Sequence, residues 1–325
     1  MVAATLTVEN HLPADFTART LREDVLAGLT APDKWLPPRW FYDDRGSELF
    51  DEITRLPEYY PTRAERSILQ ARAAEIAAVS AATSLVELGA GSAEKTHLLI
   101  DAFRATGSFR TYIPVDVSDA ALRTASAGLL WEYPGLAVHA VVADFERHLD
   151  RLPTTGHRMV ALLGGTIGNL VPETRARFLK NVRSALRPGE TLLLGTDLVK
   201  SPDVLIPAYD DAAGVTAEFN RNVLNVLNRE LGADFETDAF THVAAWDAEH
   251  EWIEMRLRAG HAMRVRIPAV DLSVGLERGE TIRTEISAKF RREGVAAELS
   301  AAGFGLTRWW TDEEGRFGLG LATAG

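Results

Sequence analysis

The feature that most constrains the fold is a regular alternation of apolar runs and helical patterns between residues 63 and 200. Short apolar runs such as "SLVELG" and "TLLLGTDL" read as strands. Segments such as "PETRARFLKNVRSAL" have the 3.6-residue period of a helix. Alternating strands and helices imply βαβ units, and therefore a parallel sheet with helices on both faces. The sequence predicts an α/β core in this region.

The alternation stops at residue 200. The stretch "AGVTAEFNRNVLNVLNRELG" predicts a helix, and "EWIEMRLRAGHAMRVRIP" predicts a hairpin that turns near Ala259 and Gly260. The final runs "LTRWWTD" and "FGLGLATA" predict a strand pair that completes the core sheet. We therefore expect a core domain of residues 63–200 plus 286–325, and a separate mixed α+β domain of residues 1–62 plus 201–285.

Composition narrows the possible functions. The chain of 325 residues has no cysteine, which excludes disulfides, thiolate nucleophiles and zinc–thiolate sites, and no metal site is predicted. A formal net charge of −11 disfavours binding to a nucleic-acid backbone. No apolar run is long enough to span a membrane, and the N-terminus lacks the pattern of a secretory signal. We expect a monomeric cytoplasmic enzyme that acts on small molecules, without nucleic-acid or membrane partners.

The stretch "LVELGAGSAEKT", residues 85–96, nearly matches three glycine-rich motifs. It resembles a phosphate-binding P-loop and a dinucleotide fingerprint, but both motifs need glycine where this chain has Glu94. A carboxylate at that place repels the phosphates that the loop would bind. Phosphate and dinucleotide ligands are therefore disfavoured.

The third match is to the first motif of methyltransferases that use S-adenosylmethionine (SAM). Glu87 ends the preceding strand, and a carboxylate suits the ammonium and sulfonium charges of SAM. Gly89 and Gly91 let the backbone approach the methionine part and the ribose. Asp116 ends the next strand, where an acid can accept both ribose hydroxyls. The sequence thus favours SAM as the cofactor.

The following strand ends in "ADF". Asp144 can accept a hydrogen bond from the adenine amino group, and Phe145 can stack on the ring. Acids at the ends of three successive strands then line one crevice, where open α/β sheets bind ligands. The alternative is that each acid only caps a helix N-terminus.

Two further stretches are candidates for the methylated substrate. In "LLGGTIGNL", Gly164 and Gly165 let backbone carbonyls approach an amine, and Asn169 can bind a carboxylate or merely cap the next helix. In "TEISAKF", Glu285 and Ser287 are two apart and share a strand face, so they can hold both nitrogens of a ring. Taken alone, the pattern is explained more simply by an exposed edge with a solvated carboxylate.

Longer stretches carry a resemblance to a specific family. These are "LPPRWFYDDRGSELFDEITRLPEYYPTR", "LVELGAGSAEKT", "GGTIGNL", "LLLGTDLVK", "AYDDAAGVTAEFNRNVLNVLNRELGADF", "IEMRLR", "TEISAKFR" and "WWTD". They resemble the histidine-specific Nα-methyltransferases of ergothioneine biosynthesis, which form hercynine. The resemblance implies a Rossmann-like SAM-binding core with a separate substrate-binding domain.

The resemblance also implies roles for individual residues. Five residues match the family's SAM contacts: Gly89, Lys95, Asp116, Asp144 and Phe145. Asn169 and Tyr209 match the holders of the substrate carboxylate, and the Gly164 backbone lies near the amine. Glu285 and Ser287 match the pair that binds the imidazole. Met255 matches the residue that helps to select histidine, and Tyr42 and Tyr59 line the same pocket.

The implied reaction is three successive methyl transfers from SAM to the α-nitrogen of L-histidine. SAM brings its own leaving group, so no covalent nucleophile is needed, and we expect no dedicated base. Two alternatives stay open: a SAM methyltransferase for another amine, and a SAM-binding regulatory protein without catalysis.

Overall fold

The computed structural model describes residues 5–91 and 95–325. Glu94, on which the sequence argument against a phosphate loop rests, lies outside them. The described chain divides into two compact units. The core unit contains the described residues up to Leu12, Arg63–Leu198 and Phe290–Gly325, and the second unit contains Pro13–Thr62 and Val199–Lys289.

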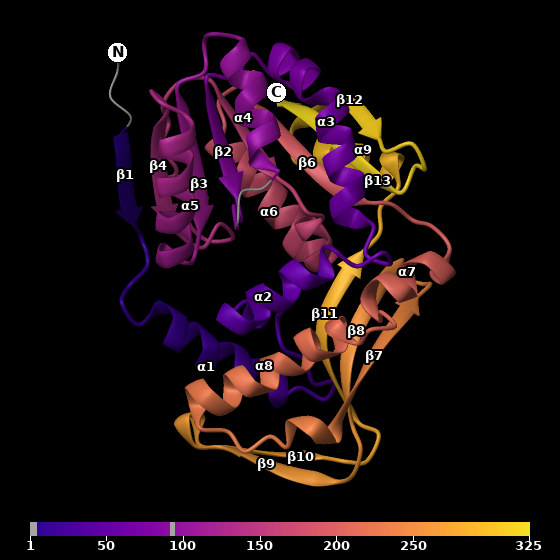
Figure 1. The fold of residues 1–325 in the computed structure, drawn as a ribbon. Coiled ribbons are helices and arrows are strands. Elements are labelled where there is room, and N and C mark those ends of the chain that lie inside the picture. Colours follow the sequence, from indigo (N-terminus) through magenta and orange to yellow (C-terminus); the bar gives the residue numbers. More distant parts are fainter. Residues whose placement is uncertain (1–4, 92–94) are drawn as a thin grey trace. The chain divides into compact units, whose positions relative to one another are not determined.

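Within the described residues the core unit builds an eight-stranded sheet in the order β1-β4-β3-β2-β5-β6-β13-β12 (Figure 1). The pairs from β1 to β6 are parallel, and β13 and β12 are antiparallel. The strands are β1 (Thr5–Asn10), β2 (Ser84–Leu88), β3 (Thr111–Asp116), β4 (Ala137–Val142), β5 (Arg158–Leu162), β6 (Thr191–Asp197), β12 (Phe304–Thr311) and β13 (Phe317–Ala324). The predicted α/β class is confirmed.

Helices or short 3-10 turns separate the parallel strands from β2 to β6, as the alternating pattern predicted. They are α4 (Thr96–Ala105), α5 (Asp119–Glu132) and α6 (Pro172–Ala185), with the 3-10 turns η2 (Leu149–Arg151) and η3 (Thr166–Asn169). Helix α3 (Pro61–Ser80) precedes β2, and α9 (Arg292–Ala301) precedes β12. The central strands β2 and β5 are buried along their whole length. Burial on both faces explains why they read as continuous apolar runs.

The strand β1 was missed by the sequence reading. It pairs in parallel with β4 and forms the sheet edge (Figure 1). Its segment therefore belongs to the core unit, although the sequence placed residues 1–62 together in the other domain. The later boundary also differs, because the second unit extends to Lys289 rather than to residue 285.

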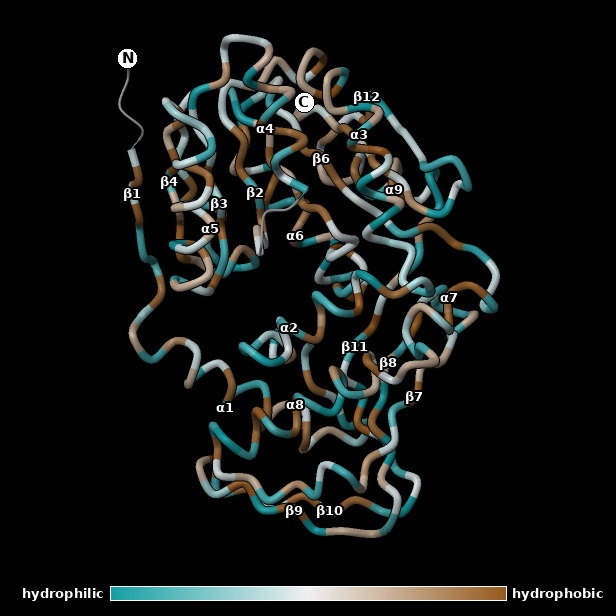
Figure 2. The backbone as a smooth tube through the Cα atoms, in the orientation of Figure 1, coloured by the Kyte–Doolittle hydropathy of each residue, from teal (hydrophilic) through white to brown (hydrophobic). Residues whose placement is uncertain are grey.

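The second unit combines helices with two small antiparallel sheets. Its described elements are α1 (Phe16–Leu29), η1 (Pro38–Phe41), α2 (Asp44–Ile53), α7 (Pro202–Tyr209), α8 (Val215–Leu231), η4 (Thr237–Ala239), β7 (Phe240–Asp247), β8 (Trp252–Ala259), β9 (Met263–Ile267), η5 (Pro268–Val270), β10 (Leu272–Leu276) and β11 (Thr281–Ala288). Polar and apolar residues alternate along α8 (Figure 2), which buries one face that includes Phe219, Val223 and Leu227.

The predicted hairpin around Ala259 and Gly260 is wrong. β8 lies between β7 and β11, so it has no edge left for β9, and β9 pairs with β10 instead. The Gly260 N–H donates to the carbonyl of Ala239 at 2.9 Å, which carries the chain away from β8. The local turn signal was present, but pairing with distant strands decided the outcome.

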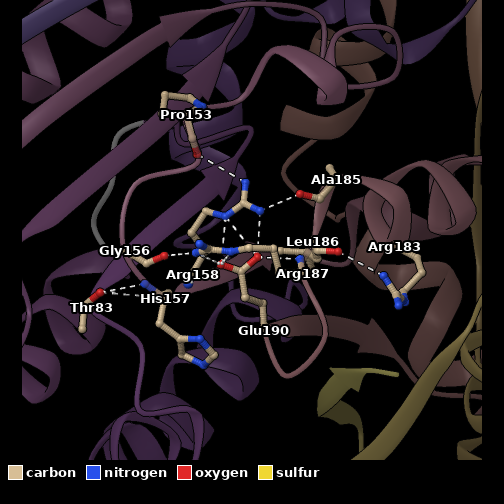
Figure 3. A network of polar contacts seen from close by, with 10 residues as sticks. All are labelled: Thr83, Pro153, Gly156, His157, Arg158, Arg183, Ala185, Leu186, Arg187 and Glu190. Carbon is tan, nitrogen blue, oxygen red and sulfur yellow. Dashed lines mark hydrogen bonds and ion pairs between the residues drawn. The ribbon is translucent and has the colours of Figure 1, made fainter.

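A buried ion pair connects the amino end of β5 with the residue before β6 (Figure 3). Arg158 and Glu190 are almost fully buried, and their closest side-chain atoms, Nη2 and Oε2, lie 2.7 Å apart. Arg158 also donates to the carbonyl of Ala185 at 2.6 Å.

No helix in the described part of the chain is long and apolar enough to cross a membrane.

Candidate active site

The carboxyl edge of the core sheet has a topological switch point between β2 and β5. From β2 the strand order runs through β3 and β4 to one side, and from β5 through β6 to the other. The loops that leave β2 and β5 therefore separate, and open α/β sheets bind their ligands at this point. The glycine-rich stretch follows β2, and the stretch "GGTIGN" follows β5.

Gly89 and Gly91 lie exposed after β2 in left-handed backbone conformations, with φ of +70° and +49°. Only glycine adopts these conformations without strain. The Asp116 carboxyl accepts the backbone N–H of Ser118 at 3.0 Å and that of Gly91. Burial raises the pKa of Asp116, and these backbone donors oppose the rise. The structure thus places the predicted ribose acid against the glycine loop.

Asp144 and Phe145 follow β4, and Phe145 is close to the same loop. A methyl group built on Gly89 would lie 3.6 Å from the Phe145 ring, which also packs edge-on against Phe178. One Asp144 oxygen accepts the Glu146 N–H at 2.9 Å. The predicted adenine-stacking residue Phe145 is therefore a neighbour of Gly89, although it lies more than fifty residues later in the chain.

Glu87 is buried beneath the loop. One of its oxygens accepts the hydroxyls of Thr96 and Tyr112, each at 2.6 Å. Burial raises the pKa of Glu87, and these hydroxyl hydrogen bonds oppose the rise. The observed contacts tie the end of β2 to the first residue of α4 and to β3, so they give this acid a structural task in shaping the loop.

Lys95 is directed to a carboxylate. It lies at the start of α4, and its ammonium pairs with the fully buried Glu65 of α3. Both Glu65 oxygens also accept the N–H of Gly164, at 2.9 Å each. The lysine of a P-loop instead serves a phosphate, so this pairing is a second argument against a phosphate ligand.

The loop after β5 contains two consecutive left-handed residues, Gly164 (φ +76°) and Gly165 (φ +71°). Gly164 is exposed, and Asn169 lies at the end of η3, partly buried. The alternative that Asn169 is the N-cap residue of the next helix is wrong, because the N-cap position of α6 is Val171.

In the second unit, β8 and β11 bring three predicted substrate residues together. Glu285 is directly opposite Met255 in the antiparallel register, so the two side chains share a face. Ser287 lies two residues further along β11, on the same face. A register shift between Arg283 and Glu285 precedes this pair, and such irregularities re-aim the side chains that follow.

Tyr209, at the end of α7, meets this face. Its hydroxyl lies 2.7 Å from the Ser287 hydroxyl, and the buried ammonium of Lys289 donates to both oxygens at 2.8 Å. An ammonium only donates, so both oxygens act as acceptors towards it. One of the two hydroxyl hydrogens lies between Tyr209 and Ser287, so the other hydroxyl can donate to a different acceptor.

Lys289 was not singled out from the sequence. It continues the two-residue spacing of Glu285 and Ser287, and this extended pattern was the available signal. Its ammonium also lies 4.6 Å from the centre of the Tyr209 ring.

Tyr42 and Tyr59 belong to an aromatic group in the same unit. The Tyr59 ring lies 6.5 Å from that of Tyr209, and Phe50 contacts both Tyr42 and Tyr59 edge-on. Burial of its hydroxyl, together with the charges of Glu285 and Tyr209, raises the pKa of Tyr42 far above its ordinary value, although half of the residue surface is exposed. The phenol is therefore protonated at neutral pH.

A second group that the sequence analysis did not single out hydrogen-bonds to the backbone of Tyr209. The buried His242 donates from Nε2 to the Tyr209 carbonyl at 2.7 Å, and its Nδ1 accepts the Asn220 amide at 2.8 Å. Asn220 in turn accepts the Thr284 hydroxyl at 2.6 Å. This network joins α7, α8 and β11, and no local sequence pattern reveals it.

Comparison with known proteins identifies the family. Residues 21–324 match the family model described as histidine-specific methyltransferase, SAM-dependent. The chain belongs to this family. It is 57% identical over 318 residues to the histidine N-alpha-methyltransferase of Mycolicibacterium smegmatis, with 98% of this chain and 99% of the relative covered. It is 55% identical to the protein of the same name from Mycobacterium tuberculosis, with the same coverage.

A more distant member of this group is ergothioneine biosynthesis protein 1 of Neurospora crassa, 30% identical over 289 residues. The match covers 85% of this chain and 32% of the fungal protein. The resemblance predicted from the motifs is thus confirmed, and the chain is a SAM-dependent methyltransferase.

The core unit fits SAM on its own geometry. Gly89 and Gly91 expose backbone at the switch point, Asp116 lies against Gly91, and the Phe145 ring lies beside Gly89. Bound SAM supplies a methyl group on a positively charged sulfur. Among the described residues, no group of three or more His, Cys, Asp or Glu side chains is placed to hold a metal ion.

Proposed function

We propose that the protein transfers three methyl groups to the α-nitrogen of L-histidine and forms hercynine, the first step of ergothioneine biosynthesis. The observation that carries this proposal is the grouping of Tyr209, Glu285 and Ser287 with Met255 in the second unit. The names of the two mycobacterial relatives support histidine as the substrate, and the name of the fungal relative supports the pathway.

In this proposal the second unit is the substrate-binding domain. Glu285 and Ser287 bind the two imidazole nitrogens, and Met255 beside Glu285 limits the size of the side chain that fits. Tyr42 and Tyr59 form walls of the same pocket. A carboxylate that must be paired rejects side chains without an N–H more strongly than an apolar pocket can.

Other residues hold the backbone part of histidine. Tyr209 and Asn169 bind the α-carboxylate, and the carbonyl of Gly164 orients the amine. Alignment of the amine with the transferred methyl contributes up to about 7–11 kcal/mol. The protonated phenol of Tyr42 can donate a hydrogen bond but is not a base, so we propose that the amine loses its protons to water without a dedicated base.

The roles of the core unit follow the same scheme. Asp116 binds the ribose hydroxyls, while Asp144 and Phe145 bind the adenine. Gly89 and Gly91 let the backbone approach the cofactor, and Glu87 and Lys95 hold the loop in place.

The test is incubation with SAM and each of the twenty amino acids, read by mass spectrometry. We expect a gain of three methyl groups on histidine alone. Methylation of another amino acid would refute the substrate, and a reaction that stops at one or two methyl groups would refute hercynine as the product.

A further inference from the structure

Glu65 is a buried carboxylate to which the proposed reaction assigns no role. It lies on α3, and its side chain is fully buried. An ionised carboxylate is costly to bury unless it is paired and hydrogen-bonded. Glu65 meets this requirement with two different partners, the Lys95 ammonium and the Gly164 N–H.

The two partners come from the two loops that flank the switch point. Lys95 begins the helix after the glycine-rich loop of β2, and Gly164 opens the loop after β5. Lys95 and Gly164 are also close to each other, since a methyl group built on Gly164 would lie 3.7 Å from Nζ of Lys95. Glu65 thus connects the two loops through one carboxylate.

The neighbouring strand leaves space for this carboxylate. A methyl group built on Gly195 of β6 would lie 2.2 Å from Oε1 of Glu65 and 3.2 Å from the Phe317 ring. Any larger residue at position 195 would displace the carboxylate. The glycine within a buried strand therefore has a specific reason, which is the close approach of Glu65.

Stability alone does not account for this arrangement. Buried ion pairs often contribute no more than apolar residues of similar size, because desolvation offsets the attraction. What the carboxylate adds is geometry, since it fixes the Gly164 N–H and the start of α4 at one point. Glu65 is not a candidate general base, because its oxygens already accept hydrogen bonds from Lys95 and the Gly164 N–H.

We propose that Glu65 is a positioning residue that holds the cofactor loop and the Gly164 loop in register for methyl transfer. The proposal rests on the proposed function in one respect, namely that Gly164 orients the amine of the substrate. Lys95 then acts through Glu65.

The experiment compares Glu65→Gln and Lys95→Met with the wild type and with Glu75→Gln. Glu75 lies on the same helix but is partly exposed and pairs with Arg72, so its variant controls for the loss of a carboxylate from α3. The readouts are binding of S-adenosylhomocysteine by calorimetry, KM and kcat for both substrates, and thermal unfolding.

We expect Glu65→Gln to weaken S-adenosylhomocysteine binding and to lower kcat/KM for histidine, each by at least about tenfold. A glutamine is neutral and carries an NH2 donor in place of one acceptor oxygen, so the Lys95 ammonium loses its counter-charge and the Gly164 N–H loses one of its two acceptors. Lys95→Met should change the KM for histidine as well as for SAM. In a double variant that combines Glu65→Gln with Lys95→Met, the losses in kcat/KM should be much less than additive, because both substitutions break the same connection.

Wild-type ligand binding and kinetics in folded Glu65→Gln would overturn the proposal. Additive effects in the double variant, or a loss of thermal stability without a change in KM, would also overturn it, because they would show a merely structural role. If Glu65→Gln is too unstable to purify, Lys95→Met decides through the histidine KM. If the wild type does not methylate histidine, the proposed function fails, while S-adenosylhomocysteine binding still tests Glu65.

Discussion

The substitution Glu190→Gln should strongly destabilise the core unit. Glu190 accepts hydrogen bonds from the side chain and the N–H of Arg158, at distances from 2.7 to 3.2 Å. It also accepts from the N–H and side chain of Arg187, at 2.6 to 3.1 Å (Figure 3). A neutral glutamine would leave the buried guanidinium of Arg158 without its counter-charge.

The size of the effect follows from burial. Removing one partner of a buried ion pair costs about 3–5 kcal/mol of the free energy of unfolding. Arg187→Ala removes the other cation, whose side chain is 56% exposed, and should cost no more than about 1 kcal/mol. The matched pair of variants therefore separates a buried from an exposed partner of the same carboxylate.

The dependence on pH gives a second check. Burial raises the pKa of Glu190, but the hydrogen bonds from Arg158 and Arg187 outweigh it and lower the pKa from 4.5 to about 2. Because the folded pKa is depressed, the stabilisation is fully present above pH 4.5 and is lost as the pH falls towards 2. Linkage limits the loss to about 1.4 kcal/mol per pH unit, or about 3 kcal/mol in total.

Urea unfolding of the two variants and the wild type at pH 7 and pH 3 measures both effects. The difference between wild type and Glu190→Gln should shrink at the lower pH. Equal destabilisation by Glu190→Gln and Arg187→Ala, or a difference that does not change with pH, would refute the reasoning. Since this ion pair lies at the amino end of β5 and the candidate site at its carboxyl end, the KM values of folded Glu190→Gln should stay at wild-type level.

Three further outcomes are expected. Glu285→Ala should lower kcat/KM for histidine at least about tenfold, or about 1.4 kcal/mol, because an imidazole N–H loses its acceptor; steady-state kinetics checks this, and wild-type values would contradict it. Lys289→Met should raise the KM for histidine more than the KM for SAM, because the ammonium that orders the hydroxyls of Tyr209 and Ser287 is lost; an equal change in both KM values would argue against that role. Burial lowers the pKa of His242 below its ordinary 6.5, so the unfolded chain gains a proton before the folded one as the pH falls. The free energy of unfolding should therefore decrease below pH 6.5, by at most about 1.4 kcal/mol per pH unit. His242→Gln should remove this dependence in urea titrations at pH 5 to 7, and an unchanged dependence would contradict the assignment.

Local patterns were sufficient for much of the fold. Apolar runs of strand length predicted β2 and β5, because strands buried on both faces have no polar positions to interrupt them. The acids that end or follow β3 and β4 were predicted to lie together, since the carboxyl ends of parallel strands share one edge. These inferences needed only the period of each segment and the rules of parallel sheets.

Pairing between distant segments was not visible in the sequence. The strand β1 has mostly exposed residues, so its sequence gave no buried pattern, and only its partner β4 makes it part of the sheet. The hairpin prediction failed for the same reason, because β8 has two partners that lie outside the predicted turn. The contact between His242 and Tyr209 likewise joins residues that no spacing rule connects.

The glycine-rich stretch shows how a distant residue settles the meaning of a motif. The letters "GAGSAEKT" allow a phosphate site as long as Lys95 is taken to be available for a phosphate. In the structure Lys95 is neutralised by Glu65, which lies thirty residues earlier on another helix. Asp116 adds negative charge to the same sheet edge, and such an edge repels a phosphate and attracts the cationic groups of SAM. In our proposal the lysine therefore serves the geometry of the loop rather than the charge of a ligand, and the acids around it favour SAM.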